Sequence, residues 1–410
     1  MMGLLDIGLS RLGILPDWAS DSTKKAFPPR AGAPPRRGRI IPPMPEELPV
    51  VLLLSTARTF RGGERQAAVL LNALSARGFR PAAAAPPGAP LFERLSPEVL
   101  RTPLPRRSEL SPLNRFELSS LCRRLGVSVL HCNDAHALGR AAWLLGSAAR
   151  PAVVAHRRMA FPIRSRLKYS KVPDLVVAIS RTAARALEEG GVPPSMIRVV
   201  YSAVDPFFLA PPPPRTEARS ALGWPAGAPV LFYAAAFTPE KGHRLLFDAF
   251  RLVRARFPAA VLALAGSGPL EGELRSAAPP GVRFEGSLER ERLRLAYRAA
   301  DVFVFAGARE GLGTAAVEAM ACGAPVVAVD RGGVAEVVER GVTGLLAPPE
   351  PAPFAEAVVR LAGDETLRLR MGEAGRKRAA GLFAPDAMAD ALAACYRDVL
   401  AGRSGPGGAR

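Results

Sequence analysis

The sequence predicts an α/β protein made of two doubly wound, Rossmann-like domains that face each other across a cleft. From residue 49 onward, apolar runs of strand length alternate with segments of helix length, which is typical of a parallel sheet flanked by helices. The Pro- and Gly-rich stretch 206–229 interrupts this alternation once, and a second series with a similar rhythm follows. A length of 410 residues is enough for roughly two to three domains.

Three parts are therefore expected along the chain: a basic, Pro-rich tail at 1–46, a first domain at 47–205 and a second domain at 206–385. In the first domain the expected strands are 49–55, 127–131, 151–155, 174–179 and 197–200, and the expected helices are 63–77, 135–148 and 181–189. In the second domain the expected strands are 230–236, 260–265, 301–305 and 326–329, and the expected helices are 241–256, 289–299, 314–322, 333–339 and 351–362.

Composition narrows the class of protein. Hydrophobic residues make up 49% of the chain, enough for a large core, yet no apolar run reaches the ~18 residues that would span a bilayer. The first residues lack the basic start and sustained apolar core of a secretion signal. The four cysteines are scattered without metal-like spacing. We expect a cytoplasmic protein.

The net charge of +18 points to an anionic partner. Part of this charge reflects a chain generally rich in Arg, Ala, Pro and Gly, so its placement is more informative than its total. Residues 157–171 and 22–45 each carry six basic side chains and no acidic one. An anionic membrane surface is the expected partner. Nucleic acid is not, because no recognised reader motif accompanies the basic stretches.

The segment 308–328, "AREGLGTAAVEAMACGAPVVA", holds two glutamates eight positions apart. Its glycines allow a tight turn after an expected strand, Thr314 is suited to cap the following helix, and a Gly and a Pro end that helix. Glu310 then lies in the loop and Glu318 in the helix, so both can face a crevice at the carboxyl end of a parallel sheet. The alternative is that Glu318 is a solvated helix residue.

Two further loops follow expected strands. Lys241 lies at the start of an expected helix, where a lysine and free backbone N–H groups can meet a phosphate. The alternative is an ordinary surface lysine, and the small number of lysines in the chain favours the phosphate role. Gly62 and Gly63 would let the backbone approach a ligand closely, or simply form a turn.

Polar residues gather near other strand ends of the first domain. His131, Asp134 and His136 fall in "LHCNDAH", and His156 ends another expected strand. Their spacing fits no standard metal-ligand pattern, so residues lining a substrate cleft are favoured over a metal site, and any single histidine could be structural. The glycines of 264–274 do not have dinucleotide-fingerprint spacing, and no Walker A loop or H-E-x-x-H motif is present.

In their order along the chain, these segments resemble the retaining glycosyltransferases of family 4, which have the GT-B fold. The matching segments are "GGE", "HCNDAH", "AHRRMAF", "VVAIS", "VYSAVDPFF", "FTPEKG", "LAGSGP", "VRFEGSLERERLRLAYRAADVFVF", "REGLGTAAVEAMACGAPVVA" and "GVTGLLAPPE". The segment "HRRMAFP" resembles bacterial enzymes that make cell-surface polysaccharide or lipopolysaccharide. The resemblance covers about 48–400.

The resemblance implies a role for each matching residue. Glu310 would contact the donor sugar and Glu318 the ribose hydroxyls, while Lys241 would neutralise the donor diphosphate. Glu310 and Lys241 are thus the expected catalytic residues. Gly62 and Gly63 would approach the donor from across the cleft.

The remaining implied residues complete the two sides of the site. The loop residues Gly311, Leu312, Gly313 and Thr314 would bind the donor. Arg157 and Arg158 would join the four polar residues named above on the acceptor side. Helix 386–401 would return to the first domain. Two departures stand out: Ala236 replaces an arginine that often accompanies the lysine, and Leu312 replaces an aromatic residue.

The implied activity is transfer of a sugar, with retention, from a nucleotide-sugar to a glycan or lipid-linked acceptor of the cell envelope. No cofactor and no metal are expected, since the nucleotide-sugar is a substrate. The enzyme would be cytoplasmic and peripheral at the inner face of the membrane. The alternative is a catalytically degenerate protein of the same fold that binds membrane or glycan.

Overall fold

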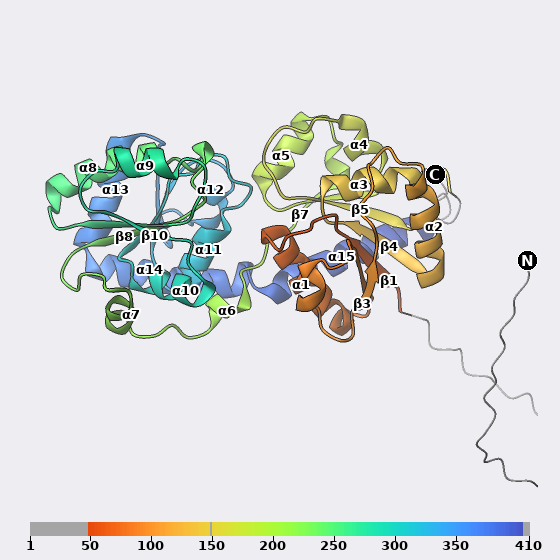
Figure 1. Ribbon diagram of the computed structural model, residues 1–410, viewed down its shortest axis with the longest axis horizontal. Helices are drawn as coiled ribbons and strands as arrows, with labels where there is room; N and C mark the ends of the chain where they lie inside the picture. The colour runs from red at the N-terminus through yellow and green to blue at the C-terminus, as the bar shows by residue number, and fades with distance from the viewer. Residues whose placement is uncertain (1–47, 148–149, 405–410) are drawn as a thin grey trace, which may run out of the picture. The chain divides into compact units, whose positions relative to one another are not determined.

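The computed structural model describes residues 48–147 and 150–404, which fold into two α/β lobes (Figure 1). Within these residues, the N-terminal lobe contains a seven-stranded sheet of order β3-β2-β1-β4-β5-β6-β7, and the C-terminal lobe a six-stranded sheet of order β10-β9-β8-β11-β12-β13. All paired strands are parallel. The predicted fold class is confirmed. The predicted tail 1–46 lies outside the described residues.

The N-terminal lobe alternates strands and helices in chain order. Its strands are β1 Val50–Leu54, β2 Arg80–Ala85, β3 Leu100–Pro103, β4 Val127–Cys132, β5 Ala152–Arg157, β6 Leu175–Ala178 and β7 Ile197–Val199. Its helices are α1 Gly62–Leu74, α2 Leu113–Leu125, α3 Ala135–Ala141, α4 Arg166–Lys171 and α5 Arg181–Glu189, with 3₁₀ turns η1 Ser75–Arg77, η2 Pro90–Arg94, η3 Ala142–Leu144 and η4 Pro194–Met196.

The C-terminal lobe repeats the pattern. Its strands are β8 Val230–Ala234, β9 Val261–Ala265, β10 Val282–Gly286, β11 Val302–Phe305, β12 Val326–Val329 and β13 Gly344–Ala347. The helices of the second half of the chain are α6 Pro206–Leu209, α7 Arg215–Leu222, α8 His243–Arg256, α9 Glu271–Ala277, α10 Arg290–Ala299, α11 Thr314–Ala321, α12 Val334–Val337, α13 Pro351–Gly363, α14 Glu365–Leu382 and α15 Pro385–Ser404, with the 3₁₀ turn η5 Pro239–Lys241.

The structure differs from the sequence-based expectation in several elements. Strands β2, β3, β10 and β13 were not expected. The sequence of β2, "RPAAAA", lacks the β-branched and aromatic residues typical of strands. The expected linker 206–229 is not irregular throughout, since it contains helices α6 and α7, and α7 packs against α10. Helix α7 has the sequence "RTEARSAL", which has ordinary helix propensity. It was not predicted because a run of prolines directly precedes it.

The strand order fixes where a ligand can bind. In each sheet the order reverses between two neighbouring strands, β1 and β4 in the first lobe and β8 and β11 in the second. Open α/β sheets bind ligands outside the carboxyl ends of the strands at this switch point. The predicted glycine loop at 62–63 follows β1, and the Glu310 loop follows β11.

The last helix does not stay with the lobe that precedes it. Helix α15 follows α14 of the C-terminal lobe but packs against α1, β4 and β5 of the N-terminal lobe. Its side chains Leu392 and Tyr396 are fully buried there. The core of the N-terminal lobe therefore includes residues from the end of the chain.

Candidate active site

A cavity of about 210 Å³ is lined by residues from both halves of the chain. The N-terminal half contributes small, polar and basic residues that follow β1, β5, β6 and β7. The C-terminal half contributes the loop after β11 and the first turns of α11. The lining residues are Gly62, Gly63, Arg65, Gln66, Arg158, Ile179, Ser202, Ala203, Asp205, Glu310, Gly311, Leu312, Gly313, Thr314 and Glu318. The predicted pair of glutamates thus lines one cavity.

Glu318 is not a solvated helix residue. It is 8% exposed, and its Oε2 accepts a hydrogen bond of 2.9 Å from the hydroxyl of Tyr297. Arg65 of helix α1 places a guanidinium nitrogen 3.6 Å from Oε1. Burial raises the pKa of Glu318 to about 7, against the opposing effects of the Tyr297 hydrogen bond and the Arg65 charge. This carboxylate is poorly solvated, and its oxygens can accept further hydrogen bonds.

Glu310 and Lys241 form an ion pair between Oε1 and Nζ. Each is also held through its main chain: Gly333 N donates to the carbonyl of Glu310 at 3.0 Å, and the Tyr233 hydroxyl donates to the carbonyl of Lys241 at 2.8 Å. Lys241 ends the 3₁₀ turn η5 and lies two residues before helix α8, which begins at His243 rather than at 241 as expected. The two predicted catalytic side chains therefore lie together.

The glycines around Glu310 allow a close approach of main chains. A Cβ at Gly311 would lie 2.3 Å from the carbonyl oxygen of Arg158, and a Cβ at Gly333 would lie 2.1 Å from the carbonyl oxygen of Gly311. Gly313 adopts φ +89°, a left-handed conformation that favours glycine. Only glycine fits at these positions. The loop is consequently pressed against the strand-end residue Arg158.

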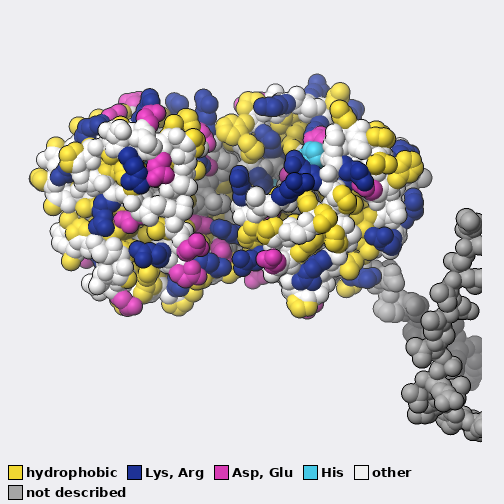
Figure 2. All heavy atoms as spheres, viewed as in Figure 1, with side chains coloured by type: hydrophobic (Ala, Val, Ile, Leu, Met, Phe, Trp, Pro, Cys, Tyr) yellow, Lys and Arg dark blue, Asp and Glu magenta, His cyan; other side chains and the backbone are white. Residues whose placement is uncertain are grey.

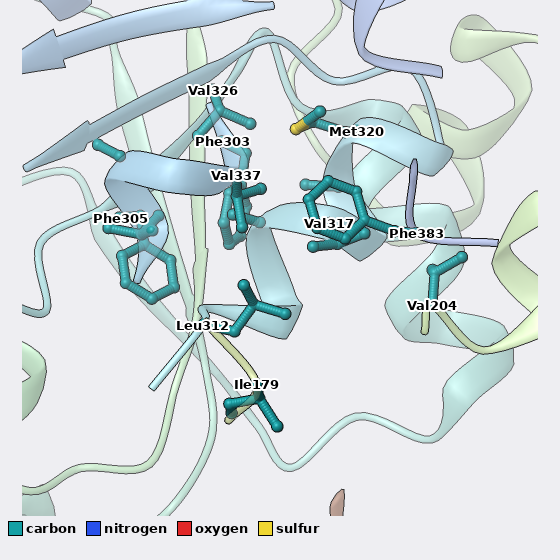
Figure 3. Close-up of a cluster of buried hydrophobic side chains, with 14 of the residues drawn as sticks. Ile179, Val204, Phe303, Phe305, Leu312, Val317, Met320, Val326, Val337 and Phe383 are labelled. Atoms are coloured by element: carbon teal, nitrogen blue, oxygen red, sulfur yellow. The ribbon is translucent and has the colours of Figure 1, made fainter. Parts of the chain in front are cut away.

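The two residues that follow complete the loop. Gly313, rather than Thr314 as expected, is the N-cap, and Thr314 is the first residue of α11. Leu312 is 2% exposed, and its side chain lies in the hydrophobic cluster that also contains Ile179, Phe305 and Val317 (Figure 3). An aliphatic residue at this position supports the loop from the core.

Gly62 and Gly63 lie at the start of helix α1. A Cβ at Gly62 would meet no atom within 4 Å, whereas a Cβ at Gly63 would lie 3.6 Å from Cδ of Arg158. Gly62 therefore faces open space in the cavity. Ala236, in the position of the missing arginine, is exposed, so its place is open to solvent.

Of the six residues predicted on the acceptor side, Arg158 lines the cavity. His131 and His156 lie behind it and are buried, with His131 Nε2 3.2 Å from His156 Nδ1. Burial, and secondarily the charge of Arg158, lowers the pKa of His131 to about 3 and that of His156 well below its usual value. Both imidazoles are neutral.

The other three predicted residues have partners away from the cavity lining. Asp134 caps helix α3 and accepts hydrogen bonds from the main chain and hydroxyl of Thr56 at 2.8 and 2.9 Å. His136 Nε2 lies 2.7 Å from the carbonyl oxygen of Arg107. Arg157 donates to the carbonyl of Phe161 at 2.6 Å. These contacts organise the loops around the site.

Some site residues could not have been found from sequence. Arg65 and Asp205 line the cavity, and Tyr297 and Tyr396 hold Glu318 and His131. Asp205 and Tyr297 lie in segments that carry the family resemblance, but nothing in those segments singles them out. Arg65 and Tyr396 lie far in sequence from their partners Glu318 and His131. Arg65 follows Gly63 by two positions, which is the one local signal available.

No three or more His, Cys, Asp or Glu side chains in 48–147 and 150–404 lie together as ligands of a metal ion would. No helix of the described part of the chain has the length and apolar character that crossing a bilayer requires.

Two glycosyltransferase family models match the chain. Residues 60–207 match the family model "Glycosyltransferase Family 4", and residues 214–378 match "Glycosyl transferases group 1". Each lobe thus matches one glycosyltransferase family model, and the two parallel-sheet lobes are those of the GT-B fold.

Curated relatives with similar sequences are also named as glycosyltransferases. The chain is 32% identical over 251 residues to D-inositol 3-phosphate glycosyltransferase of Streptomyces bingchenggensis, covering 56% of this chain and 55% of that protein. It is 33% identical over 180 residues to a GDP-mannose-dependent monoacylated alpha-(1-6)-phosphatidylinositol monomannoside mannosyltransferase of Corynebacterium glutamicum, covering 42% and 47%. The chain spans about half the length of these curated relatives.

A solved structure matches over most of its length. HepE of Anabaena, in complex with UDP and glucose, superposes with a TM-score of 0.70 at 21% identity, covering 85% of this chain and 99% of that one. At 21% identity the match shows that the two proteins share a fold.

Proposed function

We propose that this chain is a glycosyltransferase that moves a sugar from a nucleotide-sugar donor to a cell-envelope acceptor. The observation that carries the proposal is that Glu310 and Glu318 line one cavity together with the glycine loop of the opposite lobe. The relatives named above are glycosyltransferases, and HepE was solved with UDP. A nucleotide-sugar is therefore the favoured donor class.

The contacts of each glutamate fit a separate part of the donor. Glu318 is buried beside one hydroxyl donor, Tyr297, and its remaining acceptor capacity suits the two hydroxyls of a ribose. Glu310 lies at the tip of the loop, paired with Lys241, where it can contact the sugar next to the diphosphate. Both side chains already line the cavity in which these roles would place them.

The chemistry of transfer explains the lysine. As the glycosidic bond to the nucleotide breaks, negative charge grows on the diphosphate and positive charge on the sugar. Positive charge fixed beside the phosphates stabilises this state more than the ground state. Lys241 supplies one such charge, and the N-terminus of α11 adds a partial one. Retention of configuration is part of the proposal and rests on the family resemblance.

We further propose that transfer needs no metal ion, because Lys241 and main-chain N–H groups supply the positive charge at the diphosphate. Activity should then be unchanged after dialysis against EDTA. Loss of activity that added Mg²⁺ or Mn²⁺ restores would contradict this part of the proposal.

The acceptor is proposed to be a glycan or a lipid-linked molecule of the cell envelope. The Corynebacterium relative is named for a phosphatidylinositol monomannoside, a lipid acceptor. Around helix α4, Met159, Phe161 and Leu167 are exposed by 49%, 37% and 68%. Arg164, Arg166 and Lys171 are exposed beside them in sequence. This combination suits an anionic membrane surface at the inner face of the cytoplasmic membrane.

Basic side chains are not confined to that segment. Figure 2 shows Lys and Arg side chains over much of the face of the molecule in view, with hydrophobic side chains between them. Each basic residue near an anionic surface contributes about 1 kcal/mol, and salt screens the effect. Binding to vesicles that contain anionic lipid should fall as salt rises, whereas equal binding to neutral vesicles would contradict the membrane proposal.

The second candidate is a non-catalytic protein of the same fold. The exposed Ala236, in place of an arginine, is the observation that favours it, because one charge partner of the diphosphate is missing. Slow hydrolysis of nucleotide-sugars without acceptor distinguishes the two candidates. An enzyme releases nucleoside diphosphate from at least one of UDP-glucose, GDP-mannose or ADP-glucose, and a binding protein releases none.

A further inference from the structure

A chain of buried polar side chains runs from helix α15 to the cavity. The Tyr396 hydroxyl lies 2.7 Å from His131 Nδ1, and His131 Nε2 lies 3.2 Å from His156 Nδ1. A guanidinium nitrogen of Arg158 lies 3.3 Å from the same His156 Nδ1. Tyr396 and His131 are fully buried, and His156 is 6% exposed. The chain ends at Arg158, which lines the cavity.

The position of every proton in this chain follows from its two ends. A guanidinium nitrogen can only donate, so His156 Nδ1 accepts and its proton is on Nε2. His131 Nε2 faces the same acceptor and therefore carries the proton of its ring. His131 Nδ1 is then an acceptor for the Tyr396 hydroxyl. That hydroxyl has no other partner among the described residues, so donation to His131 is its one way to be satisfied.

At the other end of this hydrogen-bonded series, buried donors of Arg158 and His156 have no partner among the described residues. One nitrogen of Arg158 donates to Asn133 Oδ1 at 2.6 Å and approaches His156. Its Nε and remaining terminal nitrogen are buried, without a hydrogen-bond partner in the described residues, and so is Nε2 of His156. Burial lowers the pKa of Arg158 to about 10, which leaves it charged at neutral pH. Leaving donors of the Arg158 cation buried and unpaired costs free energy, and an anionic acceptor would remove that cost.

We propose that Tyr396 is a positioning residue of the active site. Through His131 and His156 it holds Arg158 so that the free N–H groups of the guanidinium bind an anionic phosphate or carboxylate group of a substrate. This inference rests on the proposed function and adds to it a role for the returning helix α15. The anionic group belongs either to the donor diphosphate, which lacks an arginine at Ala236, or to the acceptor.

Tyr396→Phe tests the role with little change in packing. The ring of Tyr396 stacks edge-on against Phe79 at 5.7 Å, and phenylalanine keeps that contact. Arg158 still sets the proton order in this variant, but His131 Nδ1 loses its donor, so the nitrogen-15 shift of that unprotonated nitrogen should move downfield. The chain has four histidines, so nitrogen-15 NMR of the ring nitrogens can be assigned. Wild-type His131 and His156 are both expected to be protonated on Nε2.

Calorimetry on the full chain supplies the functional readout in two arms. The first titrates a nucleoside diphosphate, and the second titrates inorganic phosphate into protein saturated with that nucleotide. Tyr396→Phe should weaken binding about 3- to 10-fold in one arm, the loss expected for one buried hydrogen bond. Arg158→Lys should weaken the same arm at least as much. Loss in the first arm assigns the group to the donor, and loss in the second to the acceptor.

Cys395→Ala, a buried change in the neighbouring residue of α15, is the control and should leave both arms and the His131 Nδ1 shift unchanged. An unchanged His131 Nδ1 shift in Tyr396→Phe, or wild-type affinity in both arms, would overturn the inference. Such a result with normal nucleotide binding by the wild type leaves the proposed function standing. Absence of nucleotide binding by the wild type would instead overturn the proposed function.

Discussion

Glu336 of the C-terminal lobe accepts hydrogen bonds from Thr182 of the N-terminal lobe. Its Oε1 lies 2.7 Å from both the amide nitrogen and the hydroxyl of Thr182, and its Oε2 lies 2.7 Å from the amide nitrogen of Arg181. These amides open helix α5, where a carboxylate is favoured by the free N–H groups and the helix dipole. Gly333, in the same segment, donates a hydrogen bond to the carbonyl of Glu310. The Glu336 contact therefore links the loop around Glu310 to the opposite lobe.

Replacing Glu336 by Ala should loosen this contact. The amides of residues 181 and 182 lose their acceptor, so we expect their hydrogen exchange to accelerate by about 10-fold or more, the equivalent of one charged hydrogen bond. Mass-spectrometric exchange over 181–189 measures it. Glu339→Ala is the matched control, since Glu339 pairs with Arg378 within its own lobe. Equal exchange in the two variants would show that Glu336 does not stabilise the contact.

Two glycines of the cavity should respond in opposite ways to alanine. Gly311→Ala places a Cβ 2.3 Å from a carbonyl oxygen that cannot move aside freely, so we expect destabilisation of about 1–3 kcal/mol. Gly62→Ala adds a Cβ in open space at the start of a helix, so the melting temperature should not fall. Differential scanning calorimetry compares them. Similar melting temperatures would mean that Gly311 has more room than its contacts indicate.

Lys241→Ala should lower turnover by about 100-fold with any donor, comparable to removal of one donor that stabilises a developing negative charge. Lys377→Ala, at an exposed position of α14, is the control. Ala236→Arg should raise activity or leave it unchanged, because the site at 236 is open. If Lys241→Ala has normal turnover and normal nucleotide affinity, the diphosphate is not bound where we propose.

Nucleotide binding should weaken as pH falls. The folded protein raises the pKa of Glu318 from 4.5 to about 7, so part of the population is protonated near neutral pH. Ribose hydroxyls donate to the carboxylate, so affinity should rise as pH increases from 6 to 8. Stability has the opposite sign: the free energy of unfolding falls as pH rises from about 4.5 to about 7, because the folded state holds the proton more tightly.

Titration calorimetry at both pH values provides the check. Glu318→Gln is the control, because its remaining pH dependence reports the nucleotide's own phosphate, whose second pKa is about 6. An identical pH dependence in wild type and Glu318→Gln would show that Glu318 does not titrate on binding.

Short motifs predicted the cavity loop around Glu310 from sequence, because the glycines that define it are spaced locally. The alternation of strands and helices predicted five of the seven strands of the first sheet and four of the six of the second. Local patterns could not predict strand β2, which is almost all alanine, or helix α7, which follows a run of prolines. Tyr396, Glu336 and Arg65 act on residues more than 100 positions away, and only the assembled fold brings such pairs together.

The acceptor side was less predictable for the same reason. A histidine or aspartate at a strand end can face a ligand or cap the next helix, and sequence does not distinguish the two. Asp134 caps α3 in the structure, and His131 lies behind Arg158 rather than at the cavity surface.

The central claim is that Glu318 binds the nucleotide and Glu310 the sugar. Calorimetric titration of UDP, GDP and ADP into wild type, Glu318→Ala and Glu310→Ala tests it most directly, since these nucleotides lack the sugar. We expect one of them to bind the wild type and Glu310→Ala alike, and to bind Glu318→Ala roughly 10- to 150-fold more weakly, the value of a charge-assisted hydrogen bond. Unchanged affinity in Glu318→Ala would contradict the claim.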